Sequence, residues 1–238
     1  MGGSQIDTQI LRARAAASPW AARIVPIAIP LMLLAPALWN GYPLLQWDTG
    51  GYLARWYEGY LVPSRSTAFG LYLHFGEDSS FWINLGFQAL ATLWILQLAL
   101  RELGMPQPLR LLAISLALVT TTALPWLAST LFTDIFAGLS VLALFILVAH
   151  GERTSPAETS LLFALTAFAA ASHSATLAVL LGAAAAYALS RFGRFRGRAL
   201  FGALIGAPLV LPEVVTGLSL LLLFVALEGA IGWPAGRR

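Results

Sequence analysis

One polar stretch of the chain, residues 40–80, carries most of the side chains that could do chemistry outside an apolar run. Asp48 opens the segment Asp48-Thr49-Gly50-Gly51-Tyr52, and Arg65 lies in Ser64-Arg65-Ser66. A carboxylate can act as a general base on a hydroxyl or bind a metal, and an arginine can hold a phosphate through two hydrogen bonds. The alternative is a solvated loop anchored at the membrane surface by Trp and Tyr, with Asp48 as a helix cap.

Two further ionisable residues lie inside or beside apolar runs. Asp134 follows Thr133 near one end of such a run, and His173 stands between two serines. Ionisable groups at membrane depth are costly and typically functional. Asp134 could instead cap a helix that starts near Phe132. For His173 we expect a turn residue and not a proton or metal site, because no second histidine or cysteine is nearby.

A third ionisable residue, Glu213, follows directly after Pro212, with Pro208 one turn earlier. Proline removes a backbone donor and clashes with the preceding turn, so a bent helix is expected here. The freed backbone groups could line a cavity in which Glu213 meets a cationic substrate. Alternatively, Glu213 pairs with the backbone or with a neighbouring helix.

Composition places these residues in a membrane protein. The chain has 238 residues, of which 58% are hydrophobic and 11% charged, whereas soluble domains average about 25% charged residues. All 14 basic residues are arginines in short clusters, with a net charge of +3, and nucleic acid is therefore not an expected partner. Cysteine is absent, which excludes disulfides, thiolate nucleophiles and zinc–thiolate sites.

The apolar runs predict an all-α polytopic membrane protein with seven membrane segments, because a span needs about 20 apolar residues. Arginine is enriched in cytoplasmic loops, so the arginines near the amino terminus and in the 191–198 cluster predict that both lie in the cytoplasm. A single span at 159–190 would place the cluster outside. This stretch is therefore expected to form a hairpin broken at Ser172-His173-Ser174. The predicted segments are 24–39, 81–100, 109–126, 131–150, the two arms of 159–190, and a bent segment at 199–227. Loop 40–80 is then external.

The carboxyl-terminal stretch closely resembles the inner-membrane permease subunits of spermidine/putrescine ABC transporters. The resemblance covers about residues 174–233 and includes Arg191-Phe192-Gly193-Arg194-Phe195-Arg196-Gly197-Arg198 and Ala207-Pro208-Leu209-Val210-Leu211-Pro212-Glu213-Val214-Val215-Thr216-Gly217. It implies a helix running inward, a basic cytoplasmic turn and a proline-broken helix running outward. Pro208, Pro212 and Glu213 would then lie on the substrate path. Such permeases continue into a loop that docks the ATPase, so a truncated permease hairpin is expected at 174–238.

Residues 24–173 resemble, in layout, membrane glycosyltransferases that use polyprenyl-phosphate sugars, and also an uncharacterised family of bacterial polytopic proteins. The similar parts are Asp48-Thr49-Gly50-Gly51-Tyr52, Ser64-Arg65-Ser66, Leu124-Pro125-Trp126-Leu127-Ala128-Ser129 and Thr133-Asp134. By this likeness Asp48 would be the catalytic or metal-binding carboxylate and Arg65 a phosphate contact.

These patterns predict three parts: a cytoplasmic amino terminus at 1–23, a membrane domain at 24–173 and the permease-like hairpin at 174–238. The favoured function is a fragmentary or chimeric permease subunit for polyamines in a bacterial inner membrane, with an ABC ATPase and a second permease subunit as partners. No cofactor is expected, and without a Walker-type phosphate loop the chain is not expected to hydrolyse ATP itself. The alternatives are a glycosyltransferase-like enzyme and a nonfunctional fusion product.

Overall fold

The computed structural model describes residues 19–63, 65–191 and 198. In that part of the chain the secondary structure is helical, apart from one isolated parallel bridge between Leu44 and Thr130. The helices are α2 (Pro19–Leu33), α3 (Ala35–Asn40), α4 (Thr49–Tyr57), α5 (Thr67–Phe75), η1 (Glu77–Ser79), α6 (Trp82–Glu102), α7 (Pro108–Thr121), α8 (Leu124–Ser129), α9 (Asp134–His150), η2 (Gly151–Arg153), α10 (Pro156–Ser172) and α11 (Ser174–Arg191). The predicted all-α class is confirmed.

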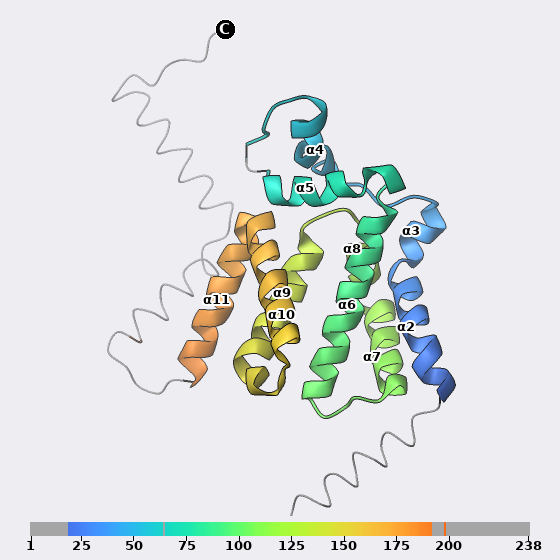
Figure 1. The fold of residues 1–238 in the computed structure, drawn as a ribbon, viewed down its shortest axis with the longest axis vertical. Helices are drawn as coiled ribbons and strands as arrows, with labels where there is room; N and C mark the ends of the chain where they lie inside the picture. The colour runs from blue at the N-terminus through green and yellow to red at the C-terminus, as the bar shows by residue number, and fades with distance from the viewer. Residues whose placement is uncertain (1–18, 64, 192–197, 199–238) are drawn as a thin grey trace, which may run out of the picture. The chain divides into compact units, whose positions relative to one another are not determined.

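The chain divides into two compact units, residues 1–180 and 181–238. Within the first unit, α2, α6, α7, α9 and α10 run lengthwise, and α4 and α5 lie across one end (Figure 1). Helix α9 packs against both α6 and α10, and α2 packs against α6 and α7. Fully buried Ile29, Leu85, Phe136 and Leu162 bring four of these helices into one core.

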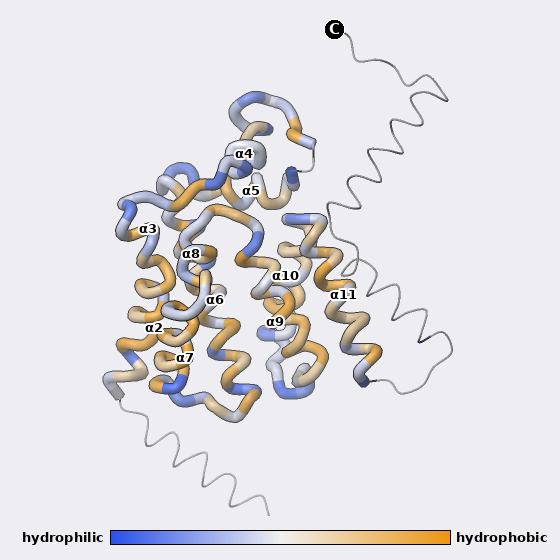
Figure 2. The backbone as a smooth tube through the Cα atoms, turned by 180° about the vertical axis from the view of Figure 1, so that it is seen from behind, coloured by the Kyte–Doolittle hydropathy of each residue, from blue (hydrophilic) through white to orange (hydrophobic). Residues whose placement is uncertain are grey.

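The lengthwise helices are apolar on their outer surfaces as well as in the core. Ile27 on α2 is 64% exposed and Leu90 on α6 is 57% exposed, both far from the helix ends. The hydropathy colouring shows apolar residues along these helices and polar residues near their ends (Figure 2). This is the pattern of helices that face lipid, and it fits the all-helical polytopic membrane protein that the sequence predicts.

The helices differ in whether they are long and apolar enough to cross a membrane. Helices α6 and α11 are long and apolar enough to cross a membrane, while α2, α7 and α9 are apolar but shorter. The number of membrane segments therefore stays a prediction, as does the cytoplasmic amino terminus.

Two of the predicted segments each contain a helix break beside a proline. Segment 24–39 is divided at Leu34 into α2 and α3, where Pro36 cannot donate a backbone hydrogen bond. Segment 109–126 is divided at Thr122, which is extended, and Pro125 occupies the first turn of α8. The predicted break at His173 is confirmed, since this residue is extended between α10 and α11. The bent segment at 199–227 lies outside the described residues.

Candidate functional site

The candidate site is built from the two short helices that cross the end of the bundle. Asp48 directly precedes α4 and Arg65 lies just before α5, and the Arg65 guanidinium donates to Asp48 Oδ1. Only 19% of the Asp48 side chain and 24% of the Arg65 side chain are exposed. Asp48 occupies the cap position of α4 but makes no side-chain cap bond. The structure therefore favours a charge pair over a solvated capping residue.

Helix α5 is placed by its own cap and by a close approach to α4. Ser66 Oγ accepts from the backbone amides of Ala68 at 3.1 Å and Phe69 at 3.4 Å, which fixes the first turn of α5 beside Arg65. A Cβ at Gly70 would lie 2.3 Å from the Tyr52 backbone oxygen, so only glycine allows α5 to pack this closely on α4. The position of Arg65 thus follows from the Ser66 cap, and its approach to Asp48 follows from the packing of α5 on α4.

Tyr52 lies one turn beyond Asp48 and supports the arginine. The Arg65 guanidinium carbon lies 5.6 Å from the centre of the Tyr52 ring, at cation–π distance. Burial raises the pKa of the Tyr52 hydroxyl, while the Thr133 hydroxyl and the charge of Arg65 offset part of the rise. The Thr133 Oγ1 atom is buried and, among the described residues, it does not reach full hydrogen-bond geometry with any partner. Tyr52 therefore stays neutral beside the ion pair.

A third segment, 129–134, joins the site from far along the chain. Leu44 N donates to Ser129 O and Leu131 N donates to Leu44 O, both at 2.9 Å, and Thr49 Oγ1 donates to Leu131 O at 3.1 Å. These bonds bring Thr133 and Asp134 to the Asp48 loop, where the Asp134 charge acts on Tyr52. Asp134 is exposed and is the first residue of α9, after the expected start near Phe132.

Gln88 on α6 holds this third segment in place, and sequence reasoning missed it. Its side chain is fully buried, and Nε2 donates to Ala128 O and Thr130 O, each at 3.0 Å. Tyr72 Oη donates to Gln88 Oε1 at 3.3 Å, which connects α5 to the same residue. The available signal was a polar stripe at intervals of four residues, Asn84, Gln88 and Thr92, in an otherwise apolar helix.

Among the described residues, the structure thus brings together the carboxylate, the arginine and the Thr133-Asp134 pair that the sequence analysis singled out. Asp48, Tyr52, Arg65, Thr133 and Asp134 come from three segments that converge at one end of the first unit. Such a group can pair an anionic ligand with Arg65 while Asp48 accepts a proton from a bound hydroxyl. The described residues include no group of three or more side chains suited to hold a metal ion.

The other candidate residues lie elsewhere. His173 is the turn residue between α10 and α11, and its backbone oxygen accepts from Thr176 N at 3.0 Å. Ser66 Oγ donates to Ala171 O, so the end of α10 does reach the start of α5. Pro208, Pro212 and Glu213 lie outside the described residues.

Comparison with known proteins gives a partial match. Over 67 residues the chain is 64% identical to "Putrescine transport system permease protein PotI" of Escherichia coli strain K12, and equally to the protein of that name from Escherichia coli O6:H1 strain CFT073. The match covers 28% of this chain, and the chain spans about a quarter of the length of these curated relatives, 24% of each. No family model and no solved structure matches. The resemblance to a polyamine ABC permease is therefore confirmed for a limited part of the chain.

Proposed function

We propose that the chain is a permease-type subunit, fragmentary or chimeric, that contributes to polyamine transport across a bacterial inner membrane. The observation that carries this proposal is the 64% identity over 67 residues to a putrescine permease. The apolar helices of the first unit support insertion in the same membrane. Energy would come from a partner ATPase, and a second permease subunit would complete the path.

Within this proposal, Glu213 is the residue that meets the cationic substrate, beside the helix break that the sequence predicts at Pro208 and Pro212. An ammonium group that leaves water is stabilised by a carboxylate in a low-dielectric path. Glutamine at position 213 has a neutral amide of the same size, so it keeps the shape of that path and removes the charge.

The test is uptake of labelled putrescine by Escherichia coli cells that lack their own PotI and express this chain with the remaining transport components. We expect uptake to be restored, and Glu213→Gln to lower it several-fold. Glu228→Gln, a second carboxylate in the same stretch of sequence, is the matched control and should leave uptake unchanged. Uptake equal to that of the empty strain, or equal loss in both variants, would contradict the proposal.

A second candidate function is glycosyl transfer from a polyprenyl-phosphate sugar, favoured by the convergence of Asp48, Arg65 and the 129–134 segment. In this function Arg65 holds the phosphate of the donor and Asp48 takes the proton of the acceptor hydroxyl. Binding of the phosphate to Arg65 would free the Asp48 carboxylate from its partner.

Transfer of labelled sugar in membranes that contain the full chain tests this second function. Asp48→Asn should lower the rate by about 100-fold or more, the usual contribution of a general base. Asp78→Asn, at an exposed carboxylate of η1, is the control. No transfer by the unaltered chain would reject this function and leave the transport proposal standing.

If neither activity appears, the remaining alternative is a fusion product without function. Sequencing the source gene as one long molecule, across the codons for Ala171 to Thr176, distinguishes the cases. A continuous reading frame supports a genuine protein in which both parts are encoded together. A break there assigns the two parts to different genes.

A further inference from the structure

A lengthwise groove lies between α6 and α10 on the first unit. It has a volume of about 470 Å³ and is lined on one side by Phe87, Leu90, Ala91 and Trp94 of α6 and on the other by Leu161, Ala164, Leu165 and Phe168 of α10, with Tyr72 of α5 at its end. Helices α6 and α10 both pack against α9, which lies between them. The lining is apolar and the groove opens to the outside of the unit, where lipid would lie.

Aromatic rings close the groove at the end nearest α5. The centre of the Phe136 ring, on α9, lies 5.5 Å from that of Tyr72 and 5.0 Å from that of Phe168. Tyr72 also lies 5.9 Å from Phe87. Because Phe136 is fully buried, these rings form a fixed end wall.

A second hollow of about 170 Å³ lies further along α6, and polar side chains are part of its lining. Trp94 lines both hollows, and Gln97, Leu98, Arg101, Pro106 and Glu158 line the second one. The lining positions on α6 recur every three or four residues from Phe87 to Arg101, so they follow one face of the helix. At 1.5 Å per residue this face runs for about 21 Å, roughly two thirds of the hydrocarbon core.

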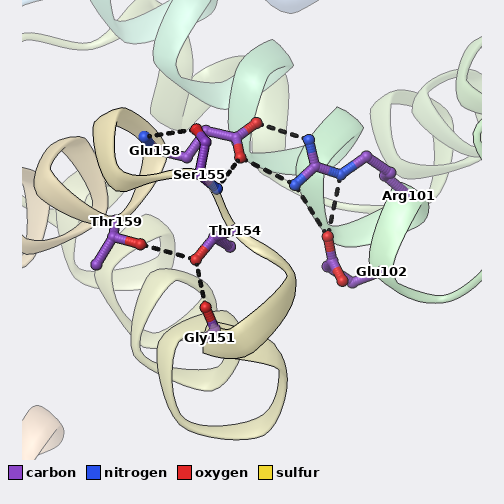
Figure 3. Close-up of polar contacts among 7 residues, drawn as sticks. All are labelled: Arg101, Glu102, Gly151, Thr154, Ser155, Glu158 and Thr159. Carbon is purple, nitrogen blue, oxygen red and sulfur yellow. Dashed lines mark hydrogen bonds and ion pairs between the residues drawn. The ribbon is translucent and has the colours of Figure 1, made fainter.

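The charged side chains that line this hollow are one guanidinium and one carboxylate, those of Arg101 and Glu158. Arg101 donates to Glu158 Oε1 at 2.6 Å and Oε2 at 3.1 Å, and its Nε donates to Glu102 Oε1 at 3.0 Å (Figure 3). One guanidinium thus faces two carboxylates, of which Glu158 lines the hollow. Arg101 is the last but one residue of α6 and Glu158 lies in the first turn of α10, so the cluster lies at helix ends, where the headgroups would lie if these helices span the membrane.

We propose that this groove holds one phospholipid with a zwitterionic headgroup that ends in a primary ammonium, of the phosphatidylethanolamine type. Its acyl chain lies along the apolar groove and ends at Tyr72 and Phe168. Its ammonium group meets Glu158, and its phosphate receives a hydrogen bond from Arg101. An anionic lipid without an ammonium fits less well, because its phosphate would meet Arg101 while Glu158 gained no cationic partner from the lipid.

The experiment is native mass spectrometry of the purified full chain, delipidated in mild detergent and offered phosphatidylethanolamine or phosphatidylglycerol. We expect one phosphatidylethanolamine per chain and about fivefold weaker retention of phosphatidylglycerol, the usual effect of one partly exposed charge pair. Equal retention of the two lipids would overturn the headgroup assignment, and no retention of either would overturn the site.

A steric variant separates the groove from lipid that binds anywhere on the surface. Ala164→Trp fills the groove without touching the ion cluster and should abolish retention. Ala113→Trp, at an exposed position of α7, is the matched control and should retain the lipid. Equal behaviour of the two variants would show that the lipid does not occupy the groove. A photo-crosslinker at position 164 that captures another part of this chain in place of lipid would also overturn the proposal.

Discussion

Arginine pairs with carboxylates at both ends of the first unit, yet the two ends use the pair differently. At one end Arg65 contacts Asp48 Oδ1, and both residues belong to the loop that they join. At the opposite end Arg101 contacts both oxygens of Glu158 and one of Glu102, and so connects α6 to α10. Glu158 is fixed further, because its Oε2 accepts from Ser155 N at 2.8 Å in a capping box (Figure 3).

The difference concerns what holds the surrounding backbone. At the Arg101 end the charges themselves connect the helices. At the Asp48 end neutral contacts do so: Gln88 fixes the 128–130 backbone, and Gly70 lets α5 pack on α4. The Asp48–Arg65 pair is thus positioned by a scaffold that does not depend on it. Arg65 could then exchange Asp48 for a ligand without loss of the surrounding fold. Four substitutions test this contrast.

Gln88→Leu should have the largest effect, because it breaks the neutral scaffold. The change leaves the carbonyls of Ala128 and Thr130 without their donor in a buried place, and each buried polar group without a partner costs about 1–3 kcal/mol. We expect the free energy of unfolding in detergent to fall by about 2–4 kcal/mol. Gln97→Leu, at an exposed position of the same helix, is the control and should change little.

Gly70→Ala should destabilise the same end by overpacking. The new Cβ would lie 2.3 Å from Tyr52 O and 2.6 Å from the Trp56 ring, so α4 and α5 must move apart. The expected loss is about 1–3 kcal/mol, measured by thermal unfolding, together with any ligand binding that needs Asp48 and Arg65 adjacent. Gly50→Ala meets nothing within 4 Å and serves as the control. Similar losses in the two variants would show that packing between α4 and α5 is not the cause.

Acid should weaken the Arg101 end before it weakens the neutral scaffold. The hydrogen bonds from Arg101 and from the Ser155 backbone lower the pKa of Glu158 to about 2 from an ordinary 4.5. Because the pKa is lower in the folded state, the stabilisation is complete above about pH 4.5 and is lost as the pH falls towards 2.

Glu158→Gln should therefore remove about 1–2 kcal/mol at neutral pH, and it should flatten the loss of stability between about pH 5 and 2. Unfolding curves across that pH range measure both effects. Glu152→Gln, at an exposed residue of η2, is the control. An unchanged pH dependence in Glu158→Gln would assign the acid sensitivity to another carboxylate.

Asp48→Asn should have the smallest effect on stability, below about 1 kcal/mol. The amide oxygen of asparagine can still accept from Arg65, and the backbone of the loop is held by Gln88 and Thr49. Thermal unfolding beside Glu158→Gln gives the comparison directly. A larger loss for Asp48→Asn than for Glu158→Gln would mean that the charge pair does hold the loop.

Local sequence signals predicted a good part of this fold. The apolar runs indicated the long helices, and Ser172-His173-Ser174 indicated the break that the structure confirms. Prolines also stand beside the breaks at Leu34 and Thr122, but α2 continues through Pro26 and Pro30, so proline alone does not decide where a helix ends. The boundaries 1–23, 24–173 and 174–238 stay predictions.

The sequence by itself determined the all-helical class, the polar character of loop 40–80 and the similarity of part of the chain to a putrescine permease, because hydropathy, charge and identity can be read without neighbours. Only the tertiary structure decided that Asp48 pairs with Arg65 instead of capping α4, and that Gln88 holds segment 128–130 beside them. These contacts join residues 17 to 42 positions apart. Their geometry depends on how α4, α5, α6 and α8 pack, and no local pattern encodes that packing.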